Sequence, residues 1–468
     1  MKPDFSEARL ALSALLIETG HMAEAESVTR GGLGLDMSAP LKGVLHNNLA
    51  LALRAQRNDR AALEHFQRAQ ALNPGIPKLD MLQAETLQAL KRPEEAMVVF
   101  EKALAADPDD PRLHRAYNEL LYRLDRADEA LKSYDRAPQS RELLLDRASF
   151  LAQAKRGEEA HAIYRDVLAA SPGDIVAAAG AANMLVMLER YEEASAAFDT
   201  ALARHTDPDL FSGAAEVALL RLDPQRAVEL SLKALELDRH HQNAIANMSV
   251  GLRLAGDEIE EALNLYDQLV QVIDLEPPPG FSSMRDFNEE LSASLDALHP
   301  QRRTHLNQTL RSGTQTHGLL FGSGQRLVDM IQARTNEAVS RYIGGLKTDE
   351  NHPFLSRHGR GFRYAGSWSS RLMDCGFHVN HIHPNGWISS CYYVGVPDAV
   401  KDEKEKQGWI KFGESGFTQL GDKNPPPRRT VQPQPGRLVL FPSYMWHGTV
   451  PFHGPTPRTT IAFDVVPA

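Results

Sequence analysis

Residues 377–396 read FHVNHIHPNGWISSCYYVGV, and residues 436–465 read GRLVLFPSYMWHGTVPFHGPTPRTTIAFDV. In the first stretch His381 and His383 stand two apart in an extended segment, so the period of two in a β-strand puts both imidazoles on one face. The second stretch contains the apolar segment Leu438–Phe441, which predicts a strand, and presents His447 after it. The two stretches therefore predict a β-rich fold that carries three histidines.

These histidines are candidate metal ligands. Two histidines from one strand and a third from a later strand can cover one face of a metal ion and leave the opposite face open for small ligands, as in non-haem iron oxygenases. Arg458 follows eleven residues after His447, with Thr460 beside it on a last alternating strand. A guanidinium can bind a carboxylate through two parallel hydrogen bonds. The pattern predicts a metal site beside an anion-binding arginine.

The order of these residues resembles the 2-oxoglutarate- and Fe(II)-dependent oxygenases, in the branch that includes the prolyl hydroxylases. The resemblance covers about residues 360–468 and implies a double-stranded β-helix, a jelly-roll or cupin-like barrel, at residues 361–468. It also implies Fe(II) as the metal, 2-oxoglutarate as the cosubstrate and O2 as the oxidant. The far carboxylate of 2-oxoglutarate would bind Arg458 with help from Thr460.

In prolyl hydroxylases a tyrosine on the strand after the first metal ligands also meets 2-oxoglutarate. Tyr392 and Tyr393 both lie on the corresponding strand here, and alternation lets only one of them point inward. We predict that Tyr392 points inward and that Tyr393 packs in the core.

The chain departs from the family pattern at one ligand. The family carries a carboxylate two residues after its first histidine, and this position is His383 here. Either three neutral imidazoles, those of His381, His383 and His447, hold the iron, or His383 is not a ligand. A three-histidine site lacks one negative charge, which predicts weaker binding of a divalent ion. We predict the three-histidine set.

Three further residues are candidates for the pocket. Arg371 lies ten residues before His381 and either meets a carboxylate in the pocket or lies on the surface. Trp387 and Trp446 stand close to the predicted ligands, where they would exclude water unless they belong to the core. The alternation also predicts that His378 points to the face opposite His381 and is structural.

The first 270 or so residues repeat themselves. An alanine, an aromatic residue and a second alanine recur in steps of 34, 34, 30 and 34 residues, at Ala62, Phe66 and Ala69, at Ala96, Phe100 and Ala103, at Ala130, Tyr134 and Ala137, at Ala160 and Tyr164, and at Ala194, Phe198 and Ala201. This period resembles the tetratricopeptide repeat. We predict about eight repeats at residues 1–275, stacked as an all-α solenoid in which the aromatic residue fills the gap between units.

A solenoid of this kind has a concave groove, and such grooves usually bind peptides or protein segments. The resemblance therefore implies a protein or peptide partner. In the alternative interpretation the array only dimerises the protein, which would make it a homo-oligomer, or only rigidifies it.

Residues 276–360 are predicted to connect the two regions. The segment EPPPG at Glu276–Gly280 ends the last repeat helix, because three consecutive prolines cannot continue it. Helical spacing at Phe287–Leu298 and Arg326–Leu346 predicts two barrel-supporting helices. Between them we predict a polar loop at Arg311–Gly324, in which His317 faces the solvent.

Thr418–Pro435 is rich in proline and polar residues, which predicts a flexible lid or substrate loop rather than a strand. Arg428 and Arg429 in this stretch are predicted to lie on the surface, with contact to an acidic substrate as the alternative.

The composition is that of a soluble protein, with 42% hydrophobic and 24% charged residues and no apolar run long enough to span a bilayer. The first residues lack the pattern of a secretory signal, and only Cys375 and Cys391 are present, so we predict a cytoplasmic protein without a disulfide scaffold. Residues 301–468 contain 20 Lys and Arg against 12 Asp and Glu, which leaves a net charge of −18 for residues 1–300. No nucleic-acid motif and no membrane segment is found in the sequence.

Together these patterns predict a multidomain α + β protein with an N-terminal tetratricopeptide-repeat solenoid and a C-terminal double-stranded β-helix. The predicted function is that of a 2-oxoglutarate- and Fe(II)-dependent dioxygenase that hydroxylates a protein or peptide presented by the repeats. Two alternatives stay open. The barrel is catalytically silent and the chain is a scaffold, or the oxygenase acts on a small metabolite and the repeats serve only assembly.

Overall fold

The computed structural model describes residues 5–56, 58–126, 128–299, 309–316, 319–357, 359 and 361–468, so the prediction for His317 lies outside the described residues. The chain forms two compact units, Met1–Phe150 with Gly322–Gly324, and Leu151–Phe321 with Gln325–Ala468. No helix in the described ranges is long and apolar enough to cross a membrane.

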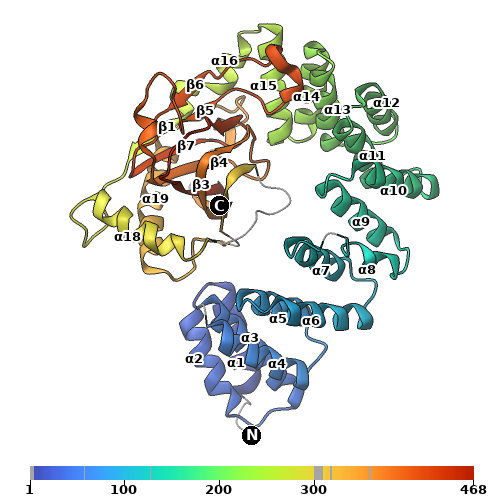
Figure 1. Cartoon of the computed structure of the whole chain (residues 1–468), viewed down its shortest axis with the longest axis vertical. Helices are drawn as coiled ribbons and strands as arrows, with labels where there is room; N and C mark the ends of the chain where they lie inside the picture. The colour runs from blue at the N-terminus through green and yellow to red at the C-terminus, as the bar shows by residue number, and fades with distance from the viewer. Residues whose placement is uncertain are drawn as a thin grey trace. The chain divides into compact units, whose positions relative to one another are not determined.

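The N-terminal region is a succession of helix pairs, which Figure 1 shows in chain order from blue to green. Its helices are α1 (Phe5–Glu18), α2 (Met22–Leu33), α3 (Ala39–Ala55), α4 (Asp59–Leu72), α5 (Leu79–Ala89), α6 (Pro93–Ala106), α7 (Pro111–Arg123), α8 (Lys132–Asp135), α9 (Arg141–Gln153), α10 (Gly157–Ala170), α11 (Ile175–Met187), α12 (Tyr191–Leu202), α13 (Pro208–Leu220), α14 (Pro224–Leu237), α15 (Gln242–Ala255), α16 (Ile259–Asn264) and α17 (Tyr266–Leu269).

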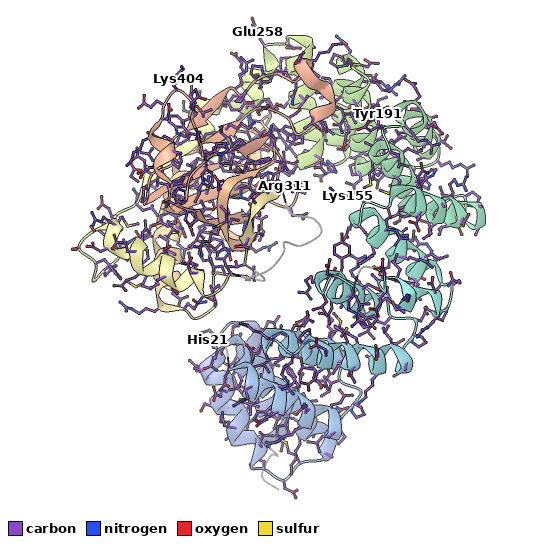
Figure 2. The ribbon with its side chains drawn as sticks, in the orientation of Figure 1. His21, Lys155, Tyr191, Glu258, Arg311 and Lys404 are labelled. Carbon is purple, nitrogen blue, oxygen red and sulfur yellow. The ribbon has the colours of Figure 1, made fainter. Side chains whose placement is uncertain are left out.

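The turn inside successive helix pairs repeats one backbone conformation. A residue in the left-handed region, with φ between 58° and 63°, follows the first helix of each pair at Lys91, Asp125, Lys155, Glu189 and Leu222. Figure 2 labels Lys155, at the turn between α9 and α10. These positions are 34, 30, 34 and 33 residues apart, so the backbone has the period that the side chains predict.

The repeated aromatic residues pack between successive pairs, as predicted. Phe198 on α12 is 1% exposed, and a Cβ added to Gly213 on α13 would lie 2.5 Å from its ring. In the same way, a Cβ added to Gly180 on α11 would lie 2.5 Å from the ring of Tyr164 on α10. The small residue on the next helix therefore makes room for the ring, which explains the close packing of the units.

The C-terminal region contains two antiparallel sheets. The larger has the strand order β1-β7-β4-β9-β3-β2 and the smaller the order β6-β5-β8. The strands are β1 (Gln271–Asp274), β2 (Leu310–Gln315), β3 (Phe362–His378), β4 (Ile388–Gly395), β5 (Ile410–Phe412), β6 (Arg429–Val431), β7 (Arg437–Pro442), β8 (His447–Thr449) and β9 (Arg458–Pro467), and the short 3-10 helices are η1 (Leu355–Arg357), η2 (Asp398–Lys401) and η3 (Thr418–Lys423). Two antiparallel sheets of this kind confirm the predicted double-stranded β-helix.

Helices α18 (Met284–Asp296) and α19 (Arg326–Gly345) form where helical spacing predicts them. Their apolar side chains, such as Phe287 and Ile331, share one hydrophobic core with strands β4, β7 and β9. Helical cover on one face and the second sheet on the other explain why every residue of β4 before Gly395 is buried.

Two predicted loops contain strands. β2 covers the first residues of Arg311–Gly324 and pairs with β3, and its polar sequence suits an edge strand. β6 lies within Thr418–Pro435 and pairs with β5. The prediction that Thr418–Pro435 contains no strand is therefore wrong, because part of this segment is held by contacts that the local sequence does not reveal.

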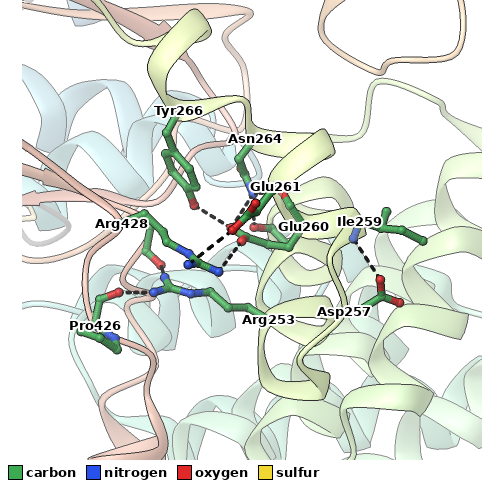
Figure 3. Close-up of polar contacts among 11 residues, drawn as sticks. Arg253, Asp257, Ile259, Glu260, Glu261, Asn264, Tyr266, Pro426 and Arg428 are labelled. Carbon is green, nitrogen blue, oxygen red and sulfur yellow. Dashed lines mark hydrogen bonds and ion pairs between the residues drawn. The ribbon is translucent and has the colours of Figure 1, made fainter.

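Contacts from the last repeat hold this segment, as Figure 3 shows. Arg253 on α15 donates a hydrogen bond to the Gly413 carbonyl (2.6 Å). It donates another to the Pro426 carbonyl, which Figure 3 labels. The fully buried Glu260 on α16 accepts hydrogen bonds from Tyr266 (3.0 Å) and Arg428 (3.1 Å). A buried carboxylate needs such partners, and Arg428 is supplied by the barrel. The cluster therefore connects the last repeat to the barrel.

Candidate metal centre

The structure brings the three predicted histidines together. His381 follows β3, and His447 opens β8. Their backbones form an antiparallel bridge, in which each amide donates to the other carbonyl over 2.9 and 3.0 Å. The His383 amide donates to the Ser443 carbonyl (2.9 Å), and the three ring centroids lie 4.3 to 5.1 Å apart. Backbone pairing therefore sets the positions of all three imidazoles.

Each ring is oriented by a hydrogen bond from Nδ1. His381 Nδ1 donates to the Val379 carbonyl (2.8 Å), His447 Nδ1 to the Met445 carbonyl (2.9 Å), and His383 Nδ1 to Asp464 Oδ1 (2.6 Å). Since these partners accept hydrogen bonds, Nδ1 of each ring is the donor, and Nε2 is the nitrogen left to bind a metal ion.

Burial keeps the rings of His381 and His447 neutral. Burial, and next the neighbouring His383, lowers the pKa of His381 to about 3, and burial followed by the other histidines lowers the pKa of His447 well below 6.5. His381 Nε2 lies 3.1 Å from His383 Nε2, so both nitrogens are directed to the same place. Two nitrogens at right angles on one ion, each about 2.1 Å from it, would stand about 3.0 Å apart. The donor set therefore fits a divalent transition-metal ion, including Fe(II).

Asp464 is the residue that the sequence interpretation missed. Besides His383 it accepts a hydrogen bond from Ser389 Oγ (2.7 Å). A carboxylate bonded to the outer nitrogen of a ligating histidine fixes the ring and raises its basicity. The negative charge that the three-histidine set lacks is thus present one hydrogen bond away, beside the very histidine that replaces the family carboxylate.

A cavity of about 300 Å³ contains the three histidines and extends to the predicted arginine. Arg458, Thr460, Ala462 and Asp464 alternate along β9, and all four line the cavity. This strand therefore connects an arginine end of the cavity with a metal end. We use these two names for the surroundings of Arg458 and of the three histidines.

Arg458 is 1% exposed. Its Nε donates to the Gly408 carbonyl (3.1 Å), and its guanidinium carbon lies 4.9 Å from the centre of the Tyr393 ring. Among the described residues no carboxylate lies within ion-pair distance of this guanidinium. A buried charge without a counter-ion is costly, so the arginine end is prepared for an anion.

The structure does not bring Tyr392 to the cavity. Its hydroxyl donates to Asn288 Oδ1 on α18 (2.6 Å), on the helix-covered face of the sheet. Tyr393 packs against Arg458 instead, and its hydroxyl has no hydrogen-bond partner among the described residues. The face of β4 that carries Tyr393, and not the face that carries Tyr392, is thus the one turned toward Arg458. The prediction had these two faces reversed, because α18 covers the face that carries Tyr392.

The other pocket candidates lie elsewhere. Arg371 pairs with Asp296 on α18 (2.7 Å). Trp387 is fully buried and donates to the Phe354 carbonyl (3.2 Å), and Trp446 packs against Phe417 outside the cavity. None of the three lines the cavity.

His378 does line the cavity, contrary to its predicted orientation. It is the last residue of β3, and the irregular backbone after it removes the strict alternation with His381. Trp368, also unforeseen, lies 5.7 Å from His383 between ring centroids. No local signal distinguishes Trp368, whereas Asp464 shares the period of two with Arg458 and Thr460.

Comparisons with known proteins agree with this description. Residues 366–464 match the family described as "Putative 2OG-Fe(II) oxygenase". Two tetratricopeptide-repeat families match, one at residues 52–120, 87–143 and 151–216 and the other at residues 119–175. No curated protein matches the chain. The assignment of the individual ligands stays a prediction.

Several solved repeat proteins are similar to parts of the chain. A tetratricopeptide repeat protein from Parabacteroides merdae is 17% identical, with 53% of this chain and 98% of that chain covered and a TM-score of 0.34. PilW, a type IV pilus biogenesis factor, is 20% identical, with 43% and 96% covered and a TM-score of 0.30. YrrB, described as having an unusual peptide-binding site, is 16% identical, with 44% and 90% covered and a TM-score of 0.23. From the family matches, the chain carries tetratricopeptide repeats in its N-terminal region and a domain of the putative 2OG-Fe(II) oxygenase family at residues 366–464.

Proposed function

We propose that this protein is a 2-oxoglutarate- and Fe(II)-dependent dioxygenase that hydroxylates a protein or peptide substrate presented by its repeat array. The observation that carries the proposal is one cavity with the three histidines at one end and, at the other, an arginine that has no carboxylate partner among the described residues. A molecule that chelates a metal through one end and presents a carboxylate at the other satisfies both ends.

Each cavity residue would have its own role in this reaction. His381, His383 and His447 would hold Fe(II), and Asp464 would orient His383 and add negative charge. Arg458 would bind the far carboxylate of 2-oxoglutarate, with the hydroxyls of Thr460 and Tyr393 close by. Bound iron would supply the activation of O2, with 2-oxoglutarate as co-reductant, to hydroxylate a C–H bond. The apolar cavity walls, such as Ile410 and Phe441, would limit the access of water.

The repeat array supports the choice of a protein or peptide as substrate, because repeat solenoids bind extended segments along their surface. The last repeat is joined to the barrel through Glu260 and Arg253, so a segment held by the neighbouring repeats would stay near the domain. Incubation of full-length protein with candidate proteins, Fe(II), 2-oxoglutarate and O2 should add the mass of one oxygen atom to a peptide. If only small metabolites were oxidised, the repeats would serve assembly alone.

The experiment that tests the metal and cosubstrate is an anaerobic titration of Fe(II) into metal-free protein that contains 2-oxoglutarate. The weak visible charge-transfer band of the chelate should appear in the wild type and be absent from His447→Ala and His383→Ala. His21→Ala, in the exposed turn between α1 and α2, is the matched control and should retain the band.

The outcomes separate the candidate sites. A band that survives in His383→Ala would leave a two-histidine site. No band in the wild type, at Fe(II) concentrations that saturate known oxygenases, would contradict the proposal and favour a scaffold with a silent barrel.

A further inference from the structure

A second group of metal-ligating side chains lies on the barrel surface, outside the cavity. Asp374 and Cys375 lie near the end of β3, and His453 lies between β8 and β9. One ligand atom from each residue can be chosen so that all three lie within 4.8 Å of one another. None of the three lines the cavity, and all are exposed, so an ion from the solvent can reach them.

The backbone of β3 explains why two neighbouring residues point the same way. In a regular strand the side chains of Asp374 and Cys375 would lie on opposite faces. Cys375 has a φ of 60°, which interrupts the alternation and turns its thiol toward the Asp374 carboxylate, 3.7 Å away. This left-handed conformation is uncommon for a residue other than Gly, Asn or Asp.

His453 is fixed by the backbone around it. The Cys375 amide donates to the Phe452 carbonyl (2.9 Å), and Phe452 itself is fully buried beside Leu310 and Leu372. The Gly454 amide donates to Asp374 Oδ1 (3.0 Å), and the His453 amide donates to Gln407 Oε1 (2.9 Å). The histidine is therefore held against the other two residues by its neighbours on both sides.

The separations of the ligand atoms match those around a tetrahedral ion. His453 Nδ1 lies 3.5 Å from Cys375 Sγ and 3.6 Å from Asp374 Oδ1, and Cys375 Sγ lies 3.7 Å from the other carboxylate oxygen, Asp374 Oδ2. Tetrahedral zinc, with bonds of about 2.3 Å to sulfur and about 2.0 to 2.2 Å to nitrogen and oxygen, places its ligand atoms about 3.4 to 3.6 Å apart.

We propose that Asp374, Cys375 and His453 form a Zn²⁺ site, with the fourth position open to water. Sulfur, imidazole and carboxylate together favour zinc over magnesium or calcium, which prefer oxygen alone. On binding, the Cys375 thiol would release its proton to the solvent and coordinate as thiolate. The ion would tie the end of β3 to the segment that leads into β9 and Arg458. The site is independent of the proposed oxygenase activity.

The first test measures the alkylation rate of Cys375 in the full-length wild type by peptide mass spectrometry. Two equivalents of Zn²⁺, enough to fill the three-histidine site as well, should slow the reaction at least tenfold. His453→Gln, which keeps the same exposed thiol, should lose most of this protection. An unchanged rate in the wild type, or equal protection in His453→Gln, would overturn the proposal.

The second test replaces zinc by Co²⁺ in the His381→Ala/His383→Ala double variant, so that the cavity no longer contributes. One equivalent should give a thiolate-to-cobalt charge-transfer band that Zn²⁺ displaces. The band should disappear in Cys375→Ser and persist in Cys391→Ser, which tests the only other cysteine. Asp374→Asn should weaken Co²⁺ binding at least tenfold. A band that survives in Cys375→Ser, or unchanged affinity in Asp374→Asn, would refute the three-ligand site, and the alkylation test remains decisive if the double variant does not fold.

Discussion

The metal end and the arginine end of the cavity differ in how their buried polar groups are balanced. At the metal end each imidazole has its outer nitrogen bonded to a protein acceptor, and Asp464 adds a negative charge. At the arginine end Arg458 has a backbone carbonyl and an aromatic ring as neighbours, without a carboxylate among the described residues. The protein therefore balances the polar groups of the metal end with its own side chains and carbonyls, whereas the arginine end depends on a ligand for charge balance.

The largest effect is expected at the arginine end. Arg458→Met should lower the affinity for 2-oxoglutarate about 100-fold or more, because a buried charge pair contributes roughly 3 kcal/mol to binding. The same variant without ligand should be more stable by about 1 to 3 kcal/mol, since a buried unpaired charge is removed. Titration of 2-oxoglutarate and urea unfolding of the ligand-free protein measure the two quantities.

Arg458→Lys is the matched variant for that experiment. It keeps the charge but cannot form two parallel hydrogen bonds, so its affinity should lie between those of the wild type and Arg458→Met. A ligand-free Arg458→Met that is less stable than the wild type would break the comparison, because it would make the arginine a structural group.

At the metal end, Asp464→Asn should weaken Fe(II) binding about 10- to 100-fold, as loss of a partner to a ligating histidine does elsewhere. The substitution preserves the shape of the side chain and removes its charge. Anaerobic Fe(II) titration measures the change, with the exposed Asp398→Asn as control. Equal Fe(II) affinities in the two variants would mean that the charge of Asp464 does not contribute to metal binding.

The sequence predicts these two ends unequally well. Helices, repeats and most strands are encoded by local periodicity, and the positions of His381, His447 and Arg458 follow from their order along the strands. Asp464 shares the period of two with Arg458, so its place on the same face of β9 also follows from the sequence.

Other features depend on contacts distant in sequence. Arg371 meets Asp296 on α18, and the stretch predicted to be a lid is held by Glu260 and Arg253 of the last repeat. The two faces of β4 are similarly apolar, and the packing of α18 on one of them decides which face is turned toward the cavity. No pattern within a single segment contains this information, because the deciding partner lies more than 70 residues away in each case.

The smallest predicted effect tests which face of β4 is turned toward Arg458. Tyr393→Phe should lower the affinity for 2-oxoglutarate about tenfold, because a hydroxyl beside Arg458 contributes about 1 to 1.5 kcal/mol to a bound carboxylate. Tyr392→Phe should leave this affinity unchanged and instead reduce the free energy of unfolding by about 1 to 2 kcal/mol, since the buried Asn288 loses its donor. The two variants remove the same atom from adjacent residues, so each is the control for the other. The opposite result, in which Tyr392→Phe weakened 2-oxoglutarate binding and Tyr393→Phe did not, would place the other face of β4 at the arginine end. The description of the cavity as a metal end and an arginine end would then be wrong.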